Sequence, residues 1–143
     1  MNILTIAMGA FVCLELLNVL MLYFTPGSRR GNGVGVFNAW EKSKEDDNVH
    51  QLVRYLVFWV AGTKLIFIGL LIVIIFTGGR TTQLVSVGVM ILSILSFYWK
   101  LYPMIRRMDH KTQITPKGYS KTLGVMIAAF VAVFLASFLI ALL

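Results

Sequence analysis

Four long apolar runs separated by shorter polar segments dominate the pattern of this 143-residue chain. Each run contains at least 18 residues with few or no charges, and ~20 such residues cross the hydrocarbon core of a bilayer as an α-helix. The pattern predicts an all-α, polytopic membrane protein, with residues 1–143 forming a single domain and four transmembrane helices forming a bundle. The predicted spans are Ile3–Phe24, Val53–Phe76, Leu84–Tyr102 and Thr122–Leu143.

Polar residues between the runs predict where the helices begin and end. The spacing of Asn48 and Gln51 resembles a capping box that opens the second helix about one turn before the membrane. Thr115 and Pro116 have the residue types of an N-cap and a first helical position, so the last helix is expected to begin there. Pro103 is expected to end or kink the third helix.

The charge distribution gives this membrane protein an orientation. Only 13% of the residues are charged, against roughly 25% in a soluble domain. Eleven of the 13 Lys and Arg residues lie at or beside the first and third connections, whereas the second connection holds only Arg80. The positive-inside rule therefore places the first and third connections in the cytoplasm and both termini outside, with the cell membrane as the expected location. This placement of the basic residues also argues against a nucleic-acid partner.

The first connection carries an aromatic pair beside lysines. Phe37 and Trp40 lie three residues apart, on one face of a predicted short helix, and Lys42 and Lys44 follow. Such a helix suits the headgroup layer of the bilayer. A solvated cytoplasmic loop is the alternative, and the sequence leaves both open.

A second aromatic and basic cluster follows the third span. Aromatic rings settle at the membrane interface and basic side chains face anionic lipid headgroups, which makes such lipids candidate partners. The same pattern also follows from the topology alone. The residues of this cluster are Trp99, Lys100, Tyr102, Arg106 and Arg107.

Two opposite charges fall near the middle of neighbouring spans. Glu15 lies in the first span and Lys64 in the second, at similar depths, and Asn18 shares a helix face with Glu15. A charge at the bilayer centre costs ~2.5–3.5 kcal/mol unless it is paired or hydrated. Consecutive helices usually pack as neighbours, so an ion pair between Glu15 and Lys64 is expected, with Asn18 and Thr63 completing the hydrogen bonds.

Three interpretations of this intramembrane polar pair are open. In the first, the two charges neutralise each other and fix the helix register without any activity. In the second, they line a site for an ion, a proton or a polar headgroup, with Glu15 as the titrating group. In the third, they do not meet, Glu15 stays protonated and Lys64 extends toward water.

The last span carries the most regular pattern in the sequence, a small residue at every fourth position. Small residues at this spacing let two helix backbones approach closely in lipid. This helix-association stripe could pack within the bundle or against a partner chain. Its members are Ser120, Gly124, Ala128, Ala132 and Ala136.

The stretch AFVCLELLNVLML around Glu15 resembles the first helix of the small multidrug resistance transporters. In that family such a glutamate binds substrate and protons, so the resemblance implies this role for Glu15 alone. The present chain departs from the family pattern through its greater length, its basic loops and Lys64, which would compete with a cationic substrate for Glu15. We therefore keep transport as an alternative and do not assign the chain to the family.

No catalytic, cofactor or metal motif stands out in the sequence. The chain lacks a dinucleotide fingerprint, HExxH, CxxC and a nucleophile elbow, and His50, Asp109 and His110 lack the spacing of a metal site. We therefore expect a non-enzymatic membrane protein without a cofactor, acting by helix association as a homo-oligomer or as a small subunit of a membrane assembly. The alternative is a small proton-coupled transporter, or a membrane protein that binds a small molecule or lipid at Glu15 and Lys64.

Overall fold

The computed structural model describes residues 2–30 and 33–143, and it is helical throughout this range apart from turns and connections. Within these residues no strand is formed, which confirms the all-α fold class predicted from the sequence. The helices are α1 (Ile3–Phe24), α2 (Asn38–Ser43), α3 (Asp47–Thr77), α4 (Arg80–Leu95), α5 (Leu101–His110) and α6 (Tyr119–Leu142). Single 3-10 turns, η1 (Val34–Val36) and η2 (Ser96–Tyr98), precede α2 and α5.

Four helical segments in the described chain are long and apolar enough to cross a membrane. They are α1, α3, α6 and the nearly continuous run from α4 to α5, Arg80–His110. Short α2 is the helix expected in the first connection. The chain therefore has the architecture of a membrane protein with four spans.

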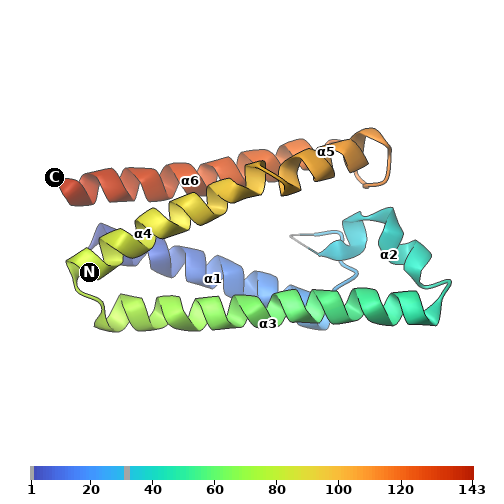
Figure 1. The fold of residues 1–143 in the computed structure, drawn as a ribbon, viewed down its shortest axis with the longest axis horizontal. Helices are drawn as coiled ribbons and strands as arrows, with labels where there is room; N and C mark the ends of the chain where they lie inside the picture. The colour runs from blue at the N-terminus through green and yellow to red at the C-terminus, as the bar shows by residue number, and fades with distance from the viewer. Residues whose placement is uncertain (1, 31–32) are drawn as a thin grey trace.

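The long helices run side by side and place the connections at two opposite ends (Figure 1). Both chain termini and the turn at Gly78 lie at one end, which we call the terminal end. The opposite end, which we call the loop end, carries α2 and the connection between α5 and α6. The first and third connections thus lie at the same end of the molecule.

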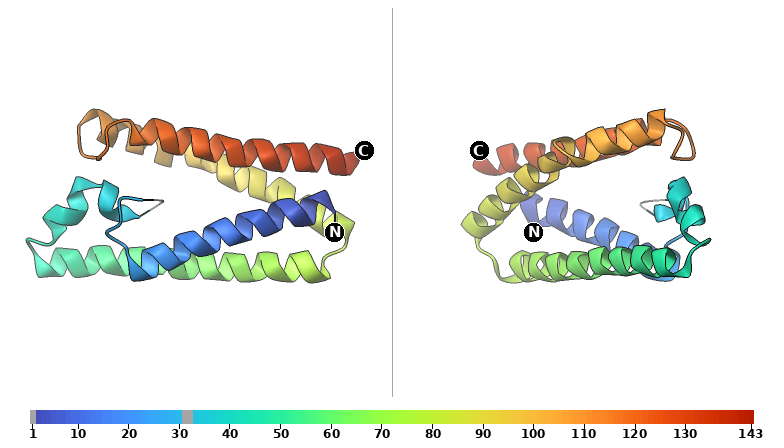
Figure 2. Two further views of the ribbon diagram at one scale, coloured as in Figure 1. Left: turned by 180° about the vertical axis from the view of Figure 1, so that it is seen from behind. Right: turned by 45° about the vertical axis from the view of Figure 1, so that its right-hand side comes forward.

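Helix α1 holds the bundle together. It crosses diagonally from α4 and α6 at the terminal end toward α3 at the loop end (Figure 2). The ring of Phe11 contacts the rings of Phe67, Phe130 and Phe134 edge-on, with centroids 6.1, 5.6 and 5.3 Å away. Such edge-to-face pairs add to the dispersion contacts that hold helices together in lipid. The aromatic contacts of the core therefore centre on α1.

Polar side chains tie the helices together at the terminal end. Asn2 caps α1 by accepting a hydrogen bond from the Thr5 backbone N–H at 2.8 Å, and its amide donates to Gln83 Oε1 at 2.8 Å. Gln83 is buried at the start of α4. The cap of α1 and the start of α4 are thus joined by one amide network.

The second long helix begins two residues earlier than the capping box predicted. Asp46, not Asn48, is the N-cap of α3, and its carboxylate accepts from the backbone N–H groups of Asn48 and Val49 at 2.9 and 3.3 Å. An ionised carboxylate at this position satisfies two free donors and suits the positive end of the helix dipole. The prediction based on Asn48 was therefore wrong in register.

The third span breaks upstream of its proline. Helix α4 ends at Leu95, and α5 resumes at Leu101 after η2. Pro103 lies in the first turn of α5, where a backbone N–H would have no partner within the helix. The expected end or kink at Pro103 is therefore displaced to Ser96–Lys100, and the helix continues well past Tyr102.

The first and third connections dock on each other. Asn38 N–H donates to Gln113 O at 2.9 Å, and Thr115 N–H donates to Val36 O at 2.8 Å. Val36, Ile105 and Ile114 form a small buried cluster beneath these bonds. This network accounts for a wrong prediction: because Thr115 pairs with the first connection, it does not cap the last helix, which begins at Tyr119.

Trp40 is buried within the first connection. Its side chain is 6% exposed and packs on the His50 ring at a centroid distance of 4.9 Å. The Ser43 hydroxyl lies 2.8 Å from His50 Nδ1 and also donates to Trp40 O. The ring therefore joins α2 to the first turn of α3.

Candidate functional site

The structure brings Glu15 and Lys64 together. Lys64 Nζ donates a hydrogen bond to Glu15 Oε2 at 2.7 Å, linking the middle of α1 to α3. The Lys64 side chain remains 28% exposed and the Glu15 side chain 19% exposed. Both residues lie near the middle of their spans, so the exposed portions of the two charged side chains lie at mid-depth. This contact contradicts the third interpretation, in which Glu15 and Lys64 do not meet.

The two polar neighbours expected around the pair do not join it. The Thr63 hydroxyl donates to Trp59 O, one turn earlier on its own helix. The side-chain amide of Asn18 is buried, and neither its nitrogen nor its oxygen has a hydrogen-bond partner. An unpaired amide in an apolar setting costs ~1–3 kcal/mol. The Asn18 amide therefore keeps a donor and an acceptor that the described chain does not use.

Two cavities open along the line where α1 faces α6, which we call the α1–α6 seam. They have volumes of about 340 and 200 Å³, and both are lined by Glu15, Met126 and Phe130. The first extends past Ser93 and Ser96 toward Lys100, while the second is lined by Asn18. Glu15 is thus held by Lys64 on one side and borders free space on the other.

The helix-association stripe of α6 is divided between inside and outside. Ser120 and Gly124 are buried, whereas Ala128, Ala132 and Ala136 are exposed. Because an α-helix has 3.6 residues per turn, a four-residue step rotates about 40° beyond one turn. The stripe therefore winds off the face that packs against the bundle.

Gly124 is the point of closest approach within the chain. A Cβ at this position would lie 2.7 Å from Cε2 of Tyr102, and the Tyr98 hydroxyl donates to Gly124 O at 2.6 Å. The absence of a side chain lets both tyrosines rest against the α6 backbone. The buried part of the stripe thus serves packing between α6 and the segment around η2 and α5.

The predicted interfacial cluster is dispersed around the break between α4 and α5. Trp99 is 77% exposed, with Lys100 Nζ 5.9 Å from its ring centroid. Arg106 and Arg107 are exposed on α5, but only Arg106 joins Tyr102 in lining a cleft. The structure therefore separates an aromatic anchor at Trp99 from a basic cleft at Arg106.

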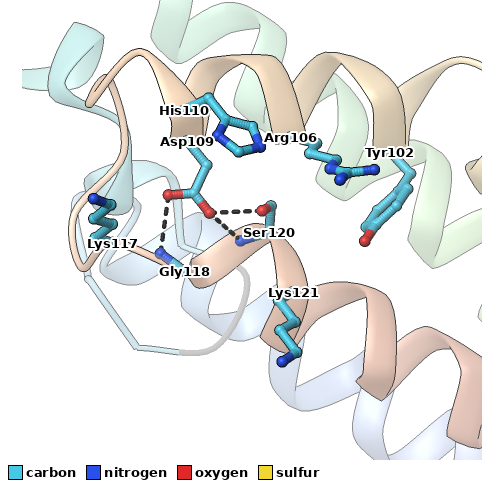
Figure 3. Close-up of a pocket in the computed structure, with 8 residues that line it drawn as sticks. All are labelled: Tyr102, Arg106, Asp109, His110, Lys117, Gly118, Ser120 and Lys121. Carbon is cyan, nitrogen blue, oxygen red and sulfur yellow. Dashed lines mark hydrogen bonds between the residues drawn. The ribbon is translucent and has the colours of Figure 1, made fainter.

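Asp109 organises this cleft, and sequence reasoning missed its role. Its carboxylate accepts hydrogen bonds from Gly118 N–H at 2.9 Å, Ser120 N–H at 3.0 Å and the Ser120 hydroxyl at 2.6 Å (Figure 3). Gly118 has a φ of 89°, in the left-handed region that favours glycine. Asp109 therefore caps α6 from the end of α5. N-cap patterns in a sequence compare residues within about one helical turn, so they do not reach a cap this far from the helix start.

The cleft has a volume of about 430 Å³ and lies between α5 and the first turn of α6 (Figure 3). Its basic residues are Arg106, His110, Lys117 and Lys121. Of these, the sequence pattern predicts only Arg106 as a contact for anionic lipid. The i, i+4 spacing of Lys117 and Lys121 near the start of a span is a signal that could have added them.

The metal ligands considered in the sequence are kept apart. Asp109 caps α6, whereas His50 contacts Trp40 and Ser43. Among the described residues, no group of three or more His, Cys, Asp or Glu side chains could hold a metal ion.

Comparisons with known proteins assign no relative to this chain. No protein-family model, no curated protein and no solved structure matches it. The functional argument therefore depends on the residues and geometry described above.

Proposed function

We propose that this protein acts in the membrane by associating with other membrane-spanning helices, with a second copy of itself as the first partner to test. The proposal is supported by one observation above all: the Glu15–Lys64 pair keeps 19% and 28% of its side chains uncovered in the middle of the spans. Charge exposed to hydrocarbon is costly, and a neighbouring helix that covers the pair would remove that cost. A small subunit of a larger assembly would meet the same need.

The outer part of the association stripe offers a second surface for such contact. Ala128, Ala132 and Ala136 are exposed on α6, and small residues at this spacing allow close approach of two helices. Gly124 is already occupied by Tyr102, so it does not belong to this surface. None of these three alanines lines either cavity that borders Glu15, so this surface and the intramembrane pair can be tested separately.

The experiment is a measurement of oligomeric state in lipid nanodiscs or mild detergent by native mass spectrometry. The double substitution Ala128→Ile, Ala132→Ile should dissociate the wild-type oligomer, because branched side chains hold the helices apart. Ala10→Ile is the matched control, since Ala10 is an exposed alanine on another helix. A wild-type chain that remains monomeric at every concentration would reject self-association.

The second candidate function is a proton-coupled transporter or a small-molecule or lipid-binding protein using the intramembrane pair. It is favoured by the two cavities that share Glu15 and by the unpartnered Asn18 amide beside one of them. A carboxylate that borders free space in the membrane can exchange a proton or bind a polar group as well as hold Lys64.

A proton-flux assay separates this candidate from association. In proteoliposomes with an internal pH dye, Glu15→Gln should abolish protein-dependent proton flux, while the exposed Glu45→Gln should leave it unchanged. Flux that persists in Glu15→Gln rejects a proton-coupled role for Glu15. Oligomerisation that survives Glu15→Gln would show that the two functions do not share this carboxylate.

We further propose that the protein lies in the cell membrane with its loop end on the cytoplasmic side. The basic residues of the first and third connections support this orientation through the positive-inside rule. In a Cys13→Ser background, a membrane-impermeant maleimide added outside should label Gly79→Cys and should leave Ser28→Cys unlabelled. The opposite labelling would invert the topology.

A further inference from the structure

The basic cleft between α5 and α6 has more positive charge than its surroundings neutralise. Arg106, Lys117 and Lys121 line it together with a single carboxylate, that of Asp109. With His110 neutral, the lining carries a net charge of +2, because three cations oppose one anion. Within the described residues, none of these three cations forms a salt bridge.

The Asp109 carboxylate is engaged by the start of α6, and within the described residues it forms no salt bridge with the cleft cations. Both of its oxygens accept hydrogen bonds from the start of α6, and the residue is only 5% exposed. Figure 3 shows Arg106 on α5, Lys117 on the turn and Lys121 on α6 around this closed network. The cations therefore present donors that the described part of the chain leaves without an anion in salt-bridge contact.

The chemistry of these donors selects a phosphate group. A guanidinium offers a planar fork that matches two phosphate oxygens, and lysine ammonium groups add point charges. The Ser120 hydroxyl donates to Asp109, so it is not available as a donor to the ligand. A cleft of about 430 Å³ accommodates a phosphate together with the small polar group esterified to it.

The surroundings of the cleft favour a ligand with an apolar tail. Lys121 and Val125 lie four residues apart on one face of α6, and Val125 is 63% exposed. Basic pockets at the ends of transmembrane helices bind phospholipid headgroups in this arrangement, with acyl chains along the helix. A soluble phosphate ester shares the headgroup chemistry but not this tail.

We propose that the cleft lined by Arg106, Lys117 and Lys121 is a binding site for the phosphate of an anionic ligand, with a phospholipid headgroup as its main source. The site does not depend on oligomerisation or on Glu15. Arg106 provides the fork, and the two lysines hold the remaining charge. Asp109 positions the site by fixing α6 against α5.

The test uses the full chain in nanodiscs of phosphatidylcholine with a minor fraction of phosphatidylglycerol. Native mass spectrometry counts the phosphatidylglycerol molecules retained by each variant. The triple substitution Arg106→Gln, Lys117→Gln, Lys121→Gln should weaken retention about tenfold more than a matched control, since charge-assisted hydrogen bonds are lost in addition to surface attraction. The control is Arg30→Gln, Lys42→Gln, Lys111→Gln, which removes equal charge from exposed residues outside the cleft.

A second arm identifies the source of the phosphate. Glycerol 3-phosphate added to protein in pure phosphatidylcholine should raise the melting temperature of the wild type only if a soluble ester suffices. Lipid retention without this shift supports a headgroup, and a shift that the cleft triple abolishes supports a soluble phosphate. Equal weakening by both triples, with no shift, would overturn the site, because only the general surface charge would then matter.

Folding of the variants is checked separately. The single changes Lys117→Gln and Lys121→Gln alter exposed side chains and should leave thermal unfolding in detergent unchanged. If the triple variant does not fold, these singles still decide the outcome, because each should reduce retention more than Lys111→Gln does.

Discussion

The loop end and the middle of the spans differ in how completely their polar groups are hydrogen-bonded. At the loop end, Asp109 accepts three hydrogen bonds and the two connections pair through backbone N–H and C=O groups. In mid-span, the Lys64–Glu15 pair has one hydrogen bond and the Asn18 amide has none. The polar groups of the loop end are therefore paired within the fold, whereas those of the mid-span keep hydrogen-bonding capacity that the described chain does not use.

The largest effect should come from reversing one charge of the intramembrane pair. Glu15→Lys or Lys64→Glu alone should lower the free energy of unfolding by about 3 kcal/mol, because two like charges would meet at mid-depth. The double reversal should recover most of this loss. Denaturant unfolding in detergent measures all three variants.

A surface pair of equal length provides the control for this prediction. Lys44 Nζ lies 2.7 Å from Glu41 Oε2, but about half of each side chain is exposed. Lys44→Gln should therefore change stability by less than ~0.5 kcal/mol. If the double reversal stays as unstable as the singles, the two residues serve separate purposes and the pair is not mainly structural.

The next largest effect should fall on the cap of α6. Asp109→Ala removes three hydrogen bonds from a buried site and should cost about 2 kcal/mol, while Asp109→Asn should retain part of this. Asp46→Ala, at the exposed cap of α3, should cost only about 1 kcal/mol. Chemical denaturation compares the two caps, and equal losses would contradict the structural role given to Asp109.

A smaller effect is expected where α6 meets Tyr102. Gly124→Ala places a methyl group 2.7 Å from the ring, so overpacking should destabilise the fold by about 1–2 kcal/mol. Gly88→Ala is the matched control, because its methyl group would lie 3.7 Å from the Phe138 ring, an ordinary contact. Thermal melting of both variants should show a loss only for Gly124→Ala. If Gly124→Ala leaves the melting temperature unchanged, Gly124 is not a tight packing contact and becomes a candidate for the outer association surface.

The smallest effect should be a gain in stability. Asn18→Leu replaces an unpartnered amide by an apolar side chain of similar size and should raise the free energy of unfolding by about 1 kcal/mol. The measurement is again unfolding in detergent. A loss of stability would mean that water, a ligand or a second chain bonds the amide, which would strengthen the case for a site in the α1–α6 seam.

Much of the architecture could be predicted because lipid imposes a strong length and polarity constraint. The four spans follow from apolar runs alone, and opposite charges at equal depth in consecutive helices were enough to expect that Glu15 would meet Lys64. The first inference uses only the length of each apolar run, and the second uses only the depths of two charges in consecutive spans.

Tertiary contacts decided what the sequence could not predict. Thr115 has a favourable cap residue type, but its N–H pairs with Val36, and a carboxylate nine residues before Gly118 caps α6 instead. The uniform four-residue stripe similarly concealed that Gly124 faces Tyr102 while Ala132 is exposed. Neither outcome can be read from residue types, since each depends on which element lies opposite.

The contact between Val36 and Thr115 has a consequence for how the chain is assembled in the membrane. Two candidate spans, Asp47–Thr77 and Arg80–His110, lie between the two segments, so the segments can meet only when both spans have crossed the bilayer and returned the chain to its starting side. A failed crossing leaves the segments on opposite faces. We therefore expect this backbone pair to close late in synthesis, after the two crossings that precede α6.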